Sequence, residues 1–90
     1  MSVEINIPPS LQALIDGVRQ VNIAGGTIGE CLKDLTLRYP QLKTKIFMRN
    51  GKLPRGMNIF INGASAGPRP LDRSVRDGDK VHIAYIVLGG

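Results

Sequence analysis

The segment Thr27–Tyr39, TIGECLKDLTLRY, carries the longest helical pattern in this 90-residue sequence. Thr27 and Glu30 form an S/T-x-x-E capping box, which predicts that the Thr27 hydroxyl accepts the Glu30 backbone N–H and that the Glu30 carboxylate reciprocates. Apolar residues then repeat with the period of about 3.6 residues that gives a helix one buried face. They are Ile28, Leu32, Leu35 and Tyr39. Pro40 ends the regular helix.

Two strands are predicted before this helix. The first covers residues 3–7, where valine and isoleucine alternate with polar residues until two prolines interrupt the pattern. The second lies within residues 18–24, and we expect the two strands to pair as a hairpin. The long loop between them carries Leu11 and Ile15, which we expect to turn back into the core.

Two further strands are predicted after the helix. Residues 57–62 alternate apolar and polar side chains and lead into Asn62-Gly63, a strong signal for a tight turn. Residues 64–70 are predicted to be a connector rich in glycine and proline, followed by a turn at residues 77–79. The last strand carries two sets of side chains on opposite faces: Val81, Ile83, Tyr85 and Val87 on one, and His82, Ala84 and Ile86 on the other.

This order of elements, β-β-α-β-β, predicts an α+β fold in which one main helix covers one side of a mixed sheet of four or five strands. That arrangement is the β-grasp, or ubiquitin-like, fold. Because the last strand joins the first hairpin only after the helix, we expect it to run through the centre of the sheet. We predict a single domain over residues 1–90, with a flexible diglycine tail at residues 87–90.

The composition is that of a folded chain, since 42% of the residues are hydrophobic and 21% are charged. The net charge of +5 is unevenly spread, because no acid occurs between Asp34 and Asp72. The same interval holds seven basic residues: Arg38, Lys43, Lys45, Arg49, Lys52, Arg55 and Arg69. A solvated surface is the simplest explanation of such a run, and a surface that binds an acidic partner is the alternative.

Residue counts exclude several kinds of site. The single cysteine, Cys31, has no partner for an internal disulfide, and one cysteine with one histidine cannot supply the ligands of a structural zinc site. Cys31 lies beside the apolar stripe of the helix and is predicted to be a small buried hydrophobe. Residues 25–29 lack the Gly-Lys-Ser/Thr ending of a P-loop, so nucleotide binding by this chain is not expected.

Targeting signals are not recognisable either. No apolar stretch approaches the ~20 residues that span a bilayer, and residues 1–4 lack the basic and apolar regions of a secretory signal. We therefore expect a cytoplasmic protein with no membrane partner.

Three features together resemble the MoaD/ThiS family of ubiquitin-like sulfur carrier proteins. They are the Asn-Ile-Phe-Ile-Asn-Gly run at residues 58–63, the turn within Val75–Val81, and the Gly89-Gly90 pair after a strand-like run. The resemblance covers nearly the whole chain. The long first loop and the Gly51–Leu53 stretch look closest to the carriers used in cysteine synthesis.

The resemblance implies a carrier that is a protein cosubstrate and not an enzyme. In that family a partner uses ATP to adenylate the C-terminal carboxylate, and sulfur then replaces AMP to give a thiocarboxylate that donates sulfur in cofactor or amino-acid biosynthesis. By position, Gly90 would carry the reacting carboxylate, and this chain would bind no cofactor itself. The implied partners are an adenylating enzyme, a sulfur-accepting synthase or sulfhydrylase, and a metalloprotease that processes the C-terminus.

The partner-binding residues that the resemblance implies are Phe60, His82, Ala84, Ile86, Val87, Leu88 and Gly89. A terminal carboxylate has a pKa near ~3.5, so it is anionic at neutral pH and must be activated before a nucleophile attacks it. Glycine has no Cβ and therefore passes through a narrow channel, while the β-branched Ile86 and Val87 stiffen the stem. The two glycines are accordingly predicted to be the reactive arm.

Other interpretations stay open on the sequence. Gly89-Gly90 could be an ordinary frayed end. The domain could be a ubiquitin-like modifier that is joined through Gly90 to lysine amines, since the activation chemistry is shared up to the adenylate. It could also be a small basic nucleic-acid-binding module, although only four aromatic residues and no recognition motif argue against a nucleic-acid partner. The product that would receive the sulfur is not readable from the residues.

Overall fold

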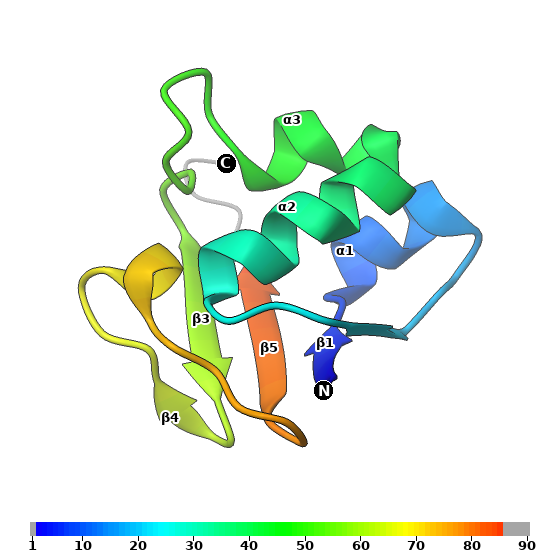
Figure 1. The fold of residues 1–90 in the computed structure, drawn as a ribbon. Coiled ribbons are helices and arrows are strands. Elements are labelled where there is room, and N and C mark those ends of the chain that lie inside the picture. The colour runs from blue at the N-terminus through cyan, green and yellow to red at the C-terminus, as the bar shows by residue number, and fades with distance from the viewer. Residues whose placement is uncertain (1, 86–90) are drawn as a thin grey trace.

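The computed structural model describes residues 2–85, in which helices cover one face of a five-stranded sheet (Figure 1). The strands are β1 (Val3–Asn6), β2 (Gln20–Ile23), β3 (Met57–Ile61), β4 (Ala64–Ser65) and β5 (Lys80–Tyr85). The α-helices are α1 (Pro9–Gln12), α2 (Ile28–Arg38) and α3 (Lys43–Ile46). Three short 3-10 helices complete the chain: η1 (Ala13–Ile15), η2 (Pro40–Leu42) and η3 (Pro70–Asp72).

The sheet has the order β2-β1-β5-β3-β4, which places β5 in the centre as predicted. β5 runs parallel to β1 and antiparallel to β3, while β1 and β2 form the expected antiparallel pair. Parallel neighbours require a long crossover connection, and the chain between β1 and β5 supplies it together with the main helix. This mixed sheet with one long helix confirms the β-grasp prediction.

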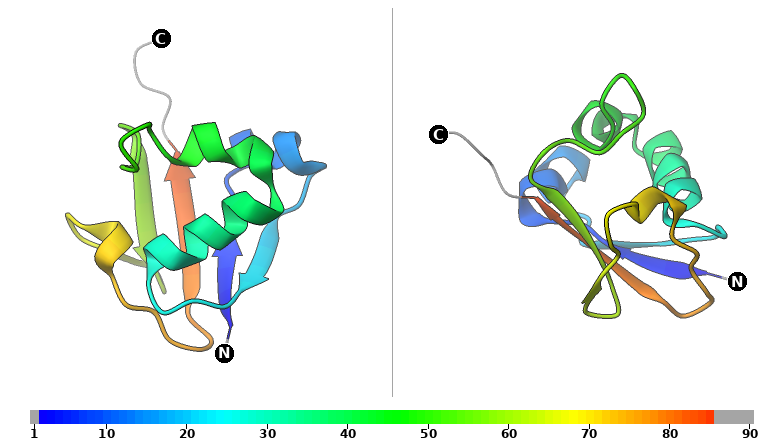
Figure 2. Two further views of the ribbon diagram at one scale, coloured as in Figure 1. Left: turned by 45° about the horizontal axis from the view of Figure 1, so that its top comes forward. Right: turned by 90° about the vertical axis from the view of Figure 1, so that its left-hand side faces the viewer.

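The main helix α2 crosses one face of the sheet, as the two views of Figure 2 show. Its predicted apolar stripe is confirmed, because Ile28, Leu32 and Leu35 are fully buried in the same cluster as the inward-facing residues of the strands. Leu42 and Ile46, from the short turns after Pro40, are fully buried too and extend that cluster. Each such side chain contributes about 1.5–3 kcal/mol on burial, so this face holds the helix to the sheet.

The N-terminus of α2 is capped almost as predicted. The Thr27 hydroxyl accepts the Glu30 backbone N–H at 3.1 Å. The Glu30 carboxylate, however, accepts the backbone N–H of Gly26 at 3.5 Å and not that of Thr27. The prediction was wrong on this partner, because the carboxylate reaches one residue further back along the chain.

The loop between β1 and β2 is more regular than predicted, because it contains α1 and η1. Pro9 stands in the first turn of α1, where its missing N–H leaves no helix bond unmade, and the Gln12 amide donates to the Ile7 carbonyl at 2.8 Å. Leu11 and Ile15 are buried, which confirms that the loop turns back into the core.

The segment expected to be only a connector begins with a strand. Asn62 and Gly63 both adopt the left-handed conformation, with φ of 51° and 87°, and close a two-residue hairpin between β3 and β4. β4 therefore pairs with the end of β3 and forms one edge of the sheet. Residues 64 and 65 were predicted wrongly because a two-residue strand has too short a pattern to recognise.

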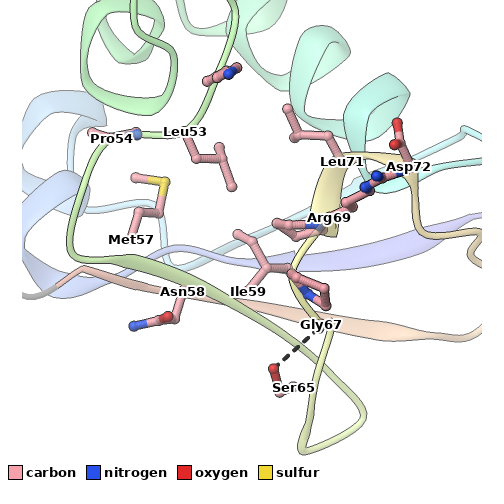
Figure 3. A pocket seen from close by; sticks show the side chains of 13 residues that line it. Leu53, Pro54, Met57, Asn58, Ile59, Ser65, Gly67, Arg69, Leu71 and Asp72 are labelled. Carbon is pink, nitrogen blue, oxygen red and sulfur yellow. Dashed lines mark hydrogen bonds between the residues drawn. The ribbon is translucent and has the colours of Figure 1, made fainter.

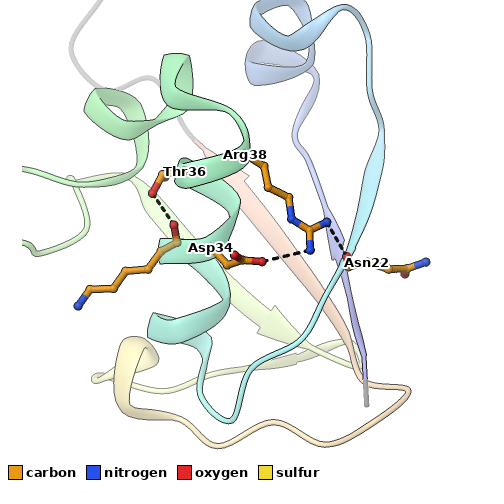
Figure 4. Close-up of polar contacts among 5 residues, drawn as sticks. Asn22, Asp34, Thr36 and Arg38 are labelled. Carbon is orange, nitrogen blue, oxygen red and sulfur yellow. Dashed lines mark hydrogen bonds and ion pairs between the residues drawn. The ribbon is translucent and has the colours of Figure 1, made fainter.

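The far edge of the sheet is tied to the helix by Arg38 (Figure 4). Its guanidinium donates to the backbone carbonyl of Asn22 in β2 at 3.1 Å and pairs with Asp34 one turn earlier on α2 at 3.2 Å. Arg38 thus occupies a carbonyl on an edge strand that would otherwise be free to pair with another chain.

Candidate functional site

The three predicted partner-binding residues in the described part of the chain share one face of the sheet. Phe60 on β3 lies directly opposite His82 on β5, and Ala84 lies opposite Asn58 one pair further along. Their neighbours in sequence, Ile59 and Ile83, are buried on the helix side. Because side chains alternate along a strand, Phe60, His82 and Ala84 point away from the helix. We call these three residues the docking face.

The docking face is partly apolar and is bordered by polar groups. His82 is exposed, while Phe60 and Ala84 are half-buried. On the β1 side, Asn6 is the register partner of His82, and its amide donates to the carboxylate of Glu4 at 3.1 Å. The three side chains therefore form a small, partly apolar patch with a hydrogen-bonding border.

The five remaining predicted residues lie outside the described residues: Ile86, Val87, Leu88, Gly89 and Gly90. The structure does define where they begin, because Tyr85 ends β5 opposite Met57, the first residue of β3. The predicted reactive arm therefore starts at the central strand and at the end of the sheet that also carries the loop before β3.

Cys31 and His82 are not brought together. Cys31 belongs to α2 and is fully buried on the side of that helix that faces the core. Burial, followed by the nearby carboxylates of Glu30 and Asp34, raises the pKa of its thiol. His82 is exposed on the opposite face of the sheet. A cysteine with a raised pKa and no basic neighbour is a poor nucleophile, so it acts as core, as predicted.

The turn at residues 77–79 is held by Asp79. Its carboxylate accepts the Arg76 backbone N–H at 2.8 Å and the Asn62 side-chain amide at 3.0 Å. The hydrogen bond from the Arg76 N–H, followed by that from the Asn62 amide, lowers the pKa of the Asp79 carboxyl group. These hydrogen bonds hold the β3–β4 turn against the start of β5.

Within residues 2–85, no three His, Cys, Asp or Glu side chains gather as a metal site.

A hollow of about 750 Å³, which was not predicted from the residues, opens beside β3 (Figure 3). Leu53, Met57, Ile59 and Leu71 converge on it from the loop before β3, from β3 and from η3. Lys52, Arg69 and Asp72 are its charged residues. The only signal available in advance was the glycine- and proline-rich stretch that forms one wall.

In the part of the chain that the structure describes, no helix is both long and apolar enough to cross a membrane.

A mixed sheet with a central last strand and one crossing helix defines the ubiquitin-like class of β-grasp proteins. The ThiS family model matches residues 8–90, and the chain therefore belongs to the ThiS family. No curated protein sequence matches it significantly.

Solved structures agree with this assignment. The chain is 30% identical to a chain of the BexX/CysO complex from Amycolatopsis orientalis, with a TM-score of 0.83 over 98% of this chain and 99% of the other. CysO from Mycobacterium tuberculosis is also 30% identical, with a TM-score of 0.83 over 94% and 99% of the two chains. Small archaeal modifier protein 1 from Haloferax volcanii is 27% identical, with a TM-score of 0.85 over the full length of both.

Proposed function

We propose that this protein is a sulfur carrier whose C-terminal Gly90 carboxylate is adenylated by a partner enzyme and converted to a thiocarboxylate. One observation carries the proposal: the match to the ThiS family extends to Gly90. In the fold, the residues of the tail follow the central strand β5 in sequence. The chain supplies the carboxylate and the docking face, and the partner supplies the ATP site. It is accordingly a cosubstrate and not an enzyme.

The chemistry assigns a definite task to each part. A Gly90 carboxylate oxygen attacks the α-phosphorus of ATP in the partner, pyrophosphate leaves, and the product is an acyl adenylate. A nucleophile at the oxidation level of sulfide (HS⁻) then attacks the acyl carbon, AMP leaves, one proton is released, and the carboxyl carbon keeps the sulfur as a thiocarboxylate. The extended tail reaches at most about 3.5 Å per residue, so residues 86–90 can enter a partner only if the domain docks close to its active site.

The docking face meets that requirement by position. Ala84 lies one residue before the last described position of β5, and it shares its outward face with His82 and Phe60. A partner seated on this face therefore lies next to the start of the tail. The central strand is bonded on both sides, which keeps that geometry rigid.

The test uses the full chain, ATP and the adenylating enzyme of the same organism, with pyrophosphate exchange as the readout. Deleting Gly90 should abolish exchange, while Ala84→Arg should lower kcat/KM for the chain by about tenfold or more because a charge then blocks the contact. Ala24→Arg, the same change at an exposed alanine after β2, is the matched control. Thermal melting must show that all variants fold.

Two further results decide the proposal. After incubation with a sulfur source, the intact chain should gain the mass that corresponds to exchange of one oxygen for one sulfur. Full exchange activity in the chain that lacks Gly90 would refute the assignment.

A second candidate function is a protein modifier. The similarity to small archaeal modifier protein 1 over the full length of both chains favours it. Because both functions begin with the adenylate, the discriminating observation comes later. Covalent ladders that depend on Gly90 and join it to lysine amines would identify the modifier.

A further inference from the structure

One end of the molecule carries a cluster of unpaired positive charge. Five basic side chains on α3 and the following loop are exposed: Lys43, Lys45, Arg49, Lys52 and Arg55. We call them the basic collar. No acidic residue occurs between Asp34 and Asp72 in the sequence, and within residues 2–85 the one ion pair is Arg38 with Asp34, which leaves the collar without a carboxylate partner.

The collar lies where the tail begins. Its loop enters β3 at Met57, and Met57 pairs with Tyr85, the last described residue of β5. In Figure 2, left, α3 and this loop stand beside the end of β5. The cluster and the start of the predicted reactive arm are therefore at the same end of the sheet.

The loop that carries the collar has a defined shape. The Met48 backbone N–H donates to the Lys52 carbonyl at 2.8 Å, and the Gly51 N–H donates to the Met48 carbonyl at 2.9 Å. The Asn50 side chain accepts the Lys52 N–H at 3.0 Å, and Gly51 takes a φ of 80°, which favours glycine. Arg49 and Lys52 thus project from a closed turn whose backbone groups are bonded internally.

Charge at the opposite end is mixed. There Arg73, Arg76 and Lys80 lie in the same stretch of chain as Asp77 and Asp79. The Asp77 carboxylate also accepts the Ser2 N–H, and Asp79 is bonded to the Arg76 backbone. The positive excess of the molecule is consequently concentrated at the end from which the tail leaves.

We propose that the basic collar docks against an acidic surface around the entrance of the protein that receives the tail. This inference rests on the proposed carrier function and adds the chemistry of its partner. Complementary charge at the edge of an interface raises the association rate of two proteins and fixes their relative orientation. Both effects favour entry of a narrow tail into the active site of the partner. Such contacts weaken as salt screens them.

The surroundings of the collar favour a protein partner over a nucleic acid. Single-stranded nucleic acids bind basic grooves that also carry exposed aromatic rings for base stacking. Three of the four aromatic residues of the chain, Tyr39, Phe47 and Tyr85, are partly buried and packed against the core. The collar therefore offers charge without a stacking surface.

The test is steady-state adenylation by the adenylating enzyme of the same organism, with the full carrier as the varied substrate. Lys43→Glu with Lys45→Glu, and separately Lys52→Glu with Arg55→Glu, should each raise KM for the carrier about tenfold at low salt. kcat should be unchanged, because the tail is intact. The difference from the wild-type chain should shrink at high salt. Lys33→Glu with Arg73→Glu, two exposed cations away from the collar, is the matched control.

The outcomes separate this inference from the function on which it rests. If the wild-type chain is adenylated and both collar variants keep the KM of the control, the collar is not a docking surface and the carrier function stands. If the wild-type chain is not adenylated at all, both proposals fall. If the collar variants instead lose salt-sensitive binding to a single-stranded RNA while KM stays constant, the surface binds nucleic acid and the inference is overturned.

Discussion

Replacing Gly29 with alanine tests how rigidly α2 is seated on η3. Gly29 lies in the first turn of α2, where alanine is the better helix former by up to about 1 kcal/mol. A Cβ at this position would stand 2.9 Å from the Leu71 carbonyl oxygen, whereas ordinary contacts begin near 3.4 Å. The Leu71 backbone must then move by the difference, 3.4 − 2.9 = 0.5 Å.

That movement is opposed by the bonds next to it. The Ile28 N–H donates to the Arg73 carbonyl at 2.9 Å, and Thr27 forms a β-bridge with Ser74. Overpacking a site of this kind costs about 1–3 kcal/mol, which exceeds the gain in helix propensity. We therefore expect Gly29→Ala to lower the free energy of unfolding by about 1–2 kcal/mol and Tm by roughly 4–16 °C.

Urea and thermal unfolding followed by circular dichroism provide the measurement. Gly26→Ala is the control, because the nearest atom to its new Cβ is a Glu30 carboxylate oxygen at 3.7 Å, an ordinary contact. It should be neutral or stabilising by up to about 1 kcal/mol, since alanine restricts the unfolded chain. A higher Tm for Gly29→Ala than for the wild-type chain would show that η3 yields freely and that the reasoning is wrong.

Two further predictions concern titrating groups. Cys31 should resist iodoacetamide in the folded protein at neutral pH, because burial raises its pKa, and should react once urea unfolds the chain; rapid alkylation of the native protein, followed by mass spectrometry, would contradict this. Asp79 has a lowered pKa, so its charged form stabilises the fold above its ordinary pKa near ~3.9, and that contribution is lost as pH falls through the lower folded value. Asp79→Asn should therefore reduce the pH dependence of Tm below about pH 4, and an unchanged profile would refute this sign.

Much of the candidate site was predictable because its pattern is local. Alternation along residues 57–62 and 80–85 places Phe60, His82 and Ala84 on one side of each strand, whatever lies beside them. Their register is a different matter. Phe60 faces His82 only because β3 and β5 pair antiparallel with this offset. Strand alternation alone does not specify that offset.

The elements that were predicted wrongly are those without a pattern long enough to read. β4 has two residues, and α1 has four. The hollow beside β3 also escaped prediction, because it forms only when the loop before β3, β3 itself and η3 fold against one another. The basic residues of the collar were visible in the sequence, but their place beside the start of the tail depends on the pairing of β3 with β5.

Taken alone, the amino-acid sequence determined the helix that begins after Thr27, the turns at residues 62–63 and 77–79, and the order of strands around them. Caps, periodicity and left-handed turn residues act over a few neighbouring positions, so they are encoded where they stand. The tertiary structure alone decided the register of β3 against β5, the pairing of β4 with β3, and that the positive charge gathers where the tail begins. Those relations depend on packing α2 against one face of the sheet, which couples residues that are tens of positions apart.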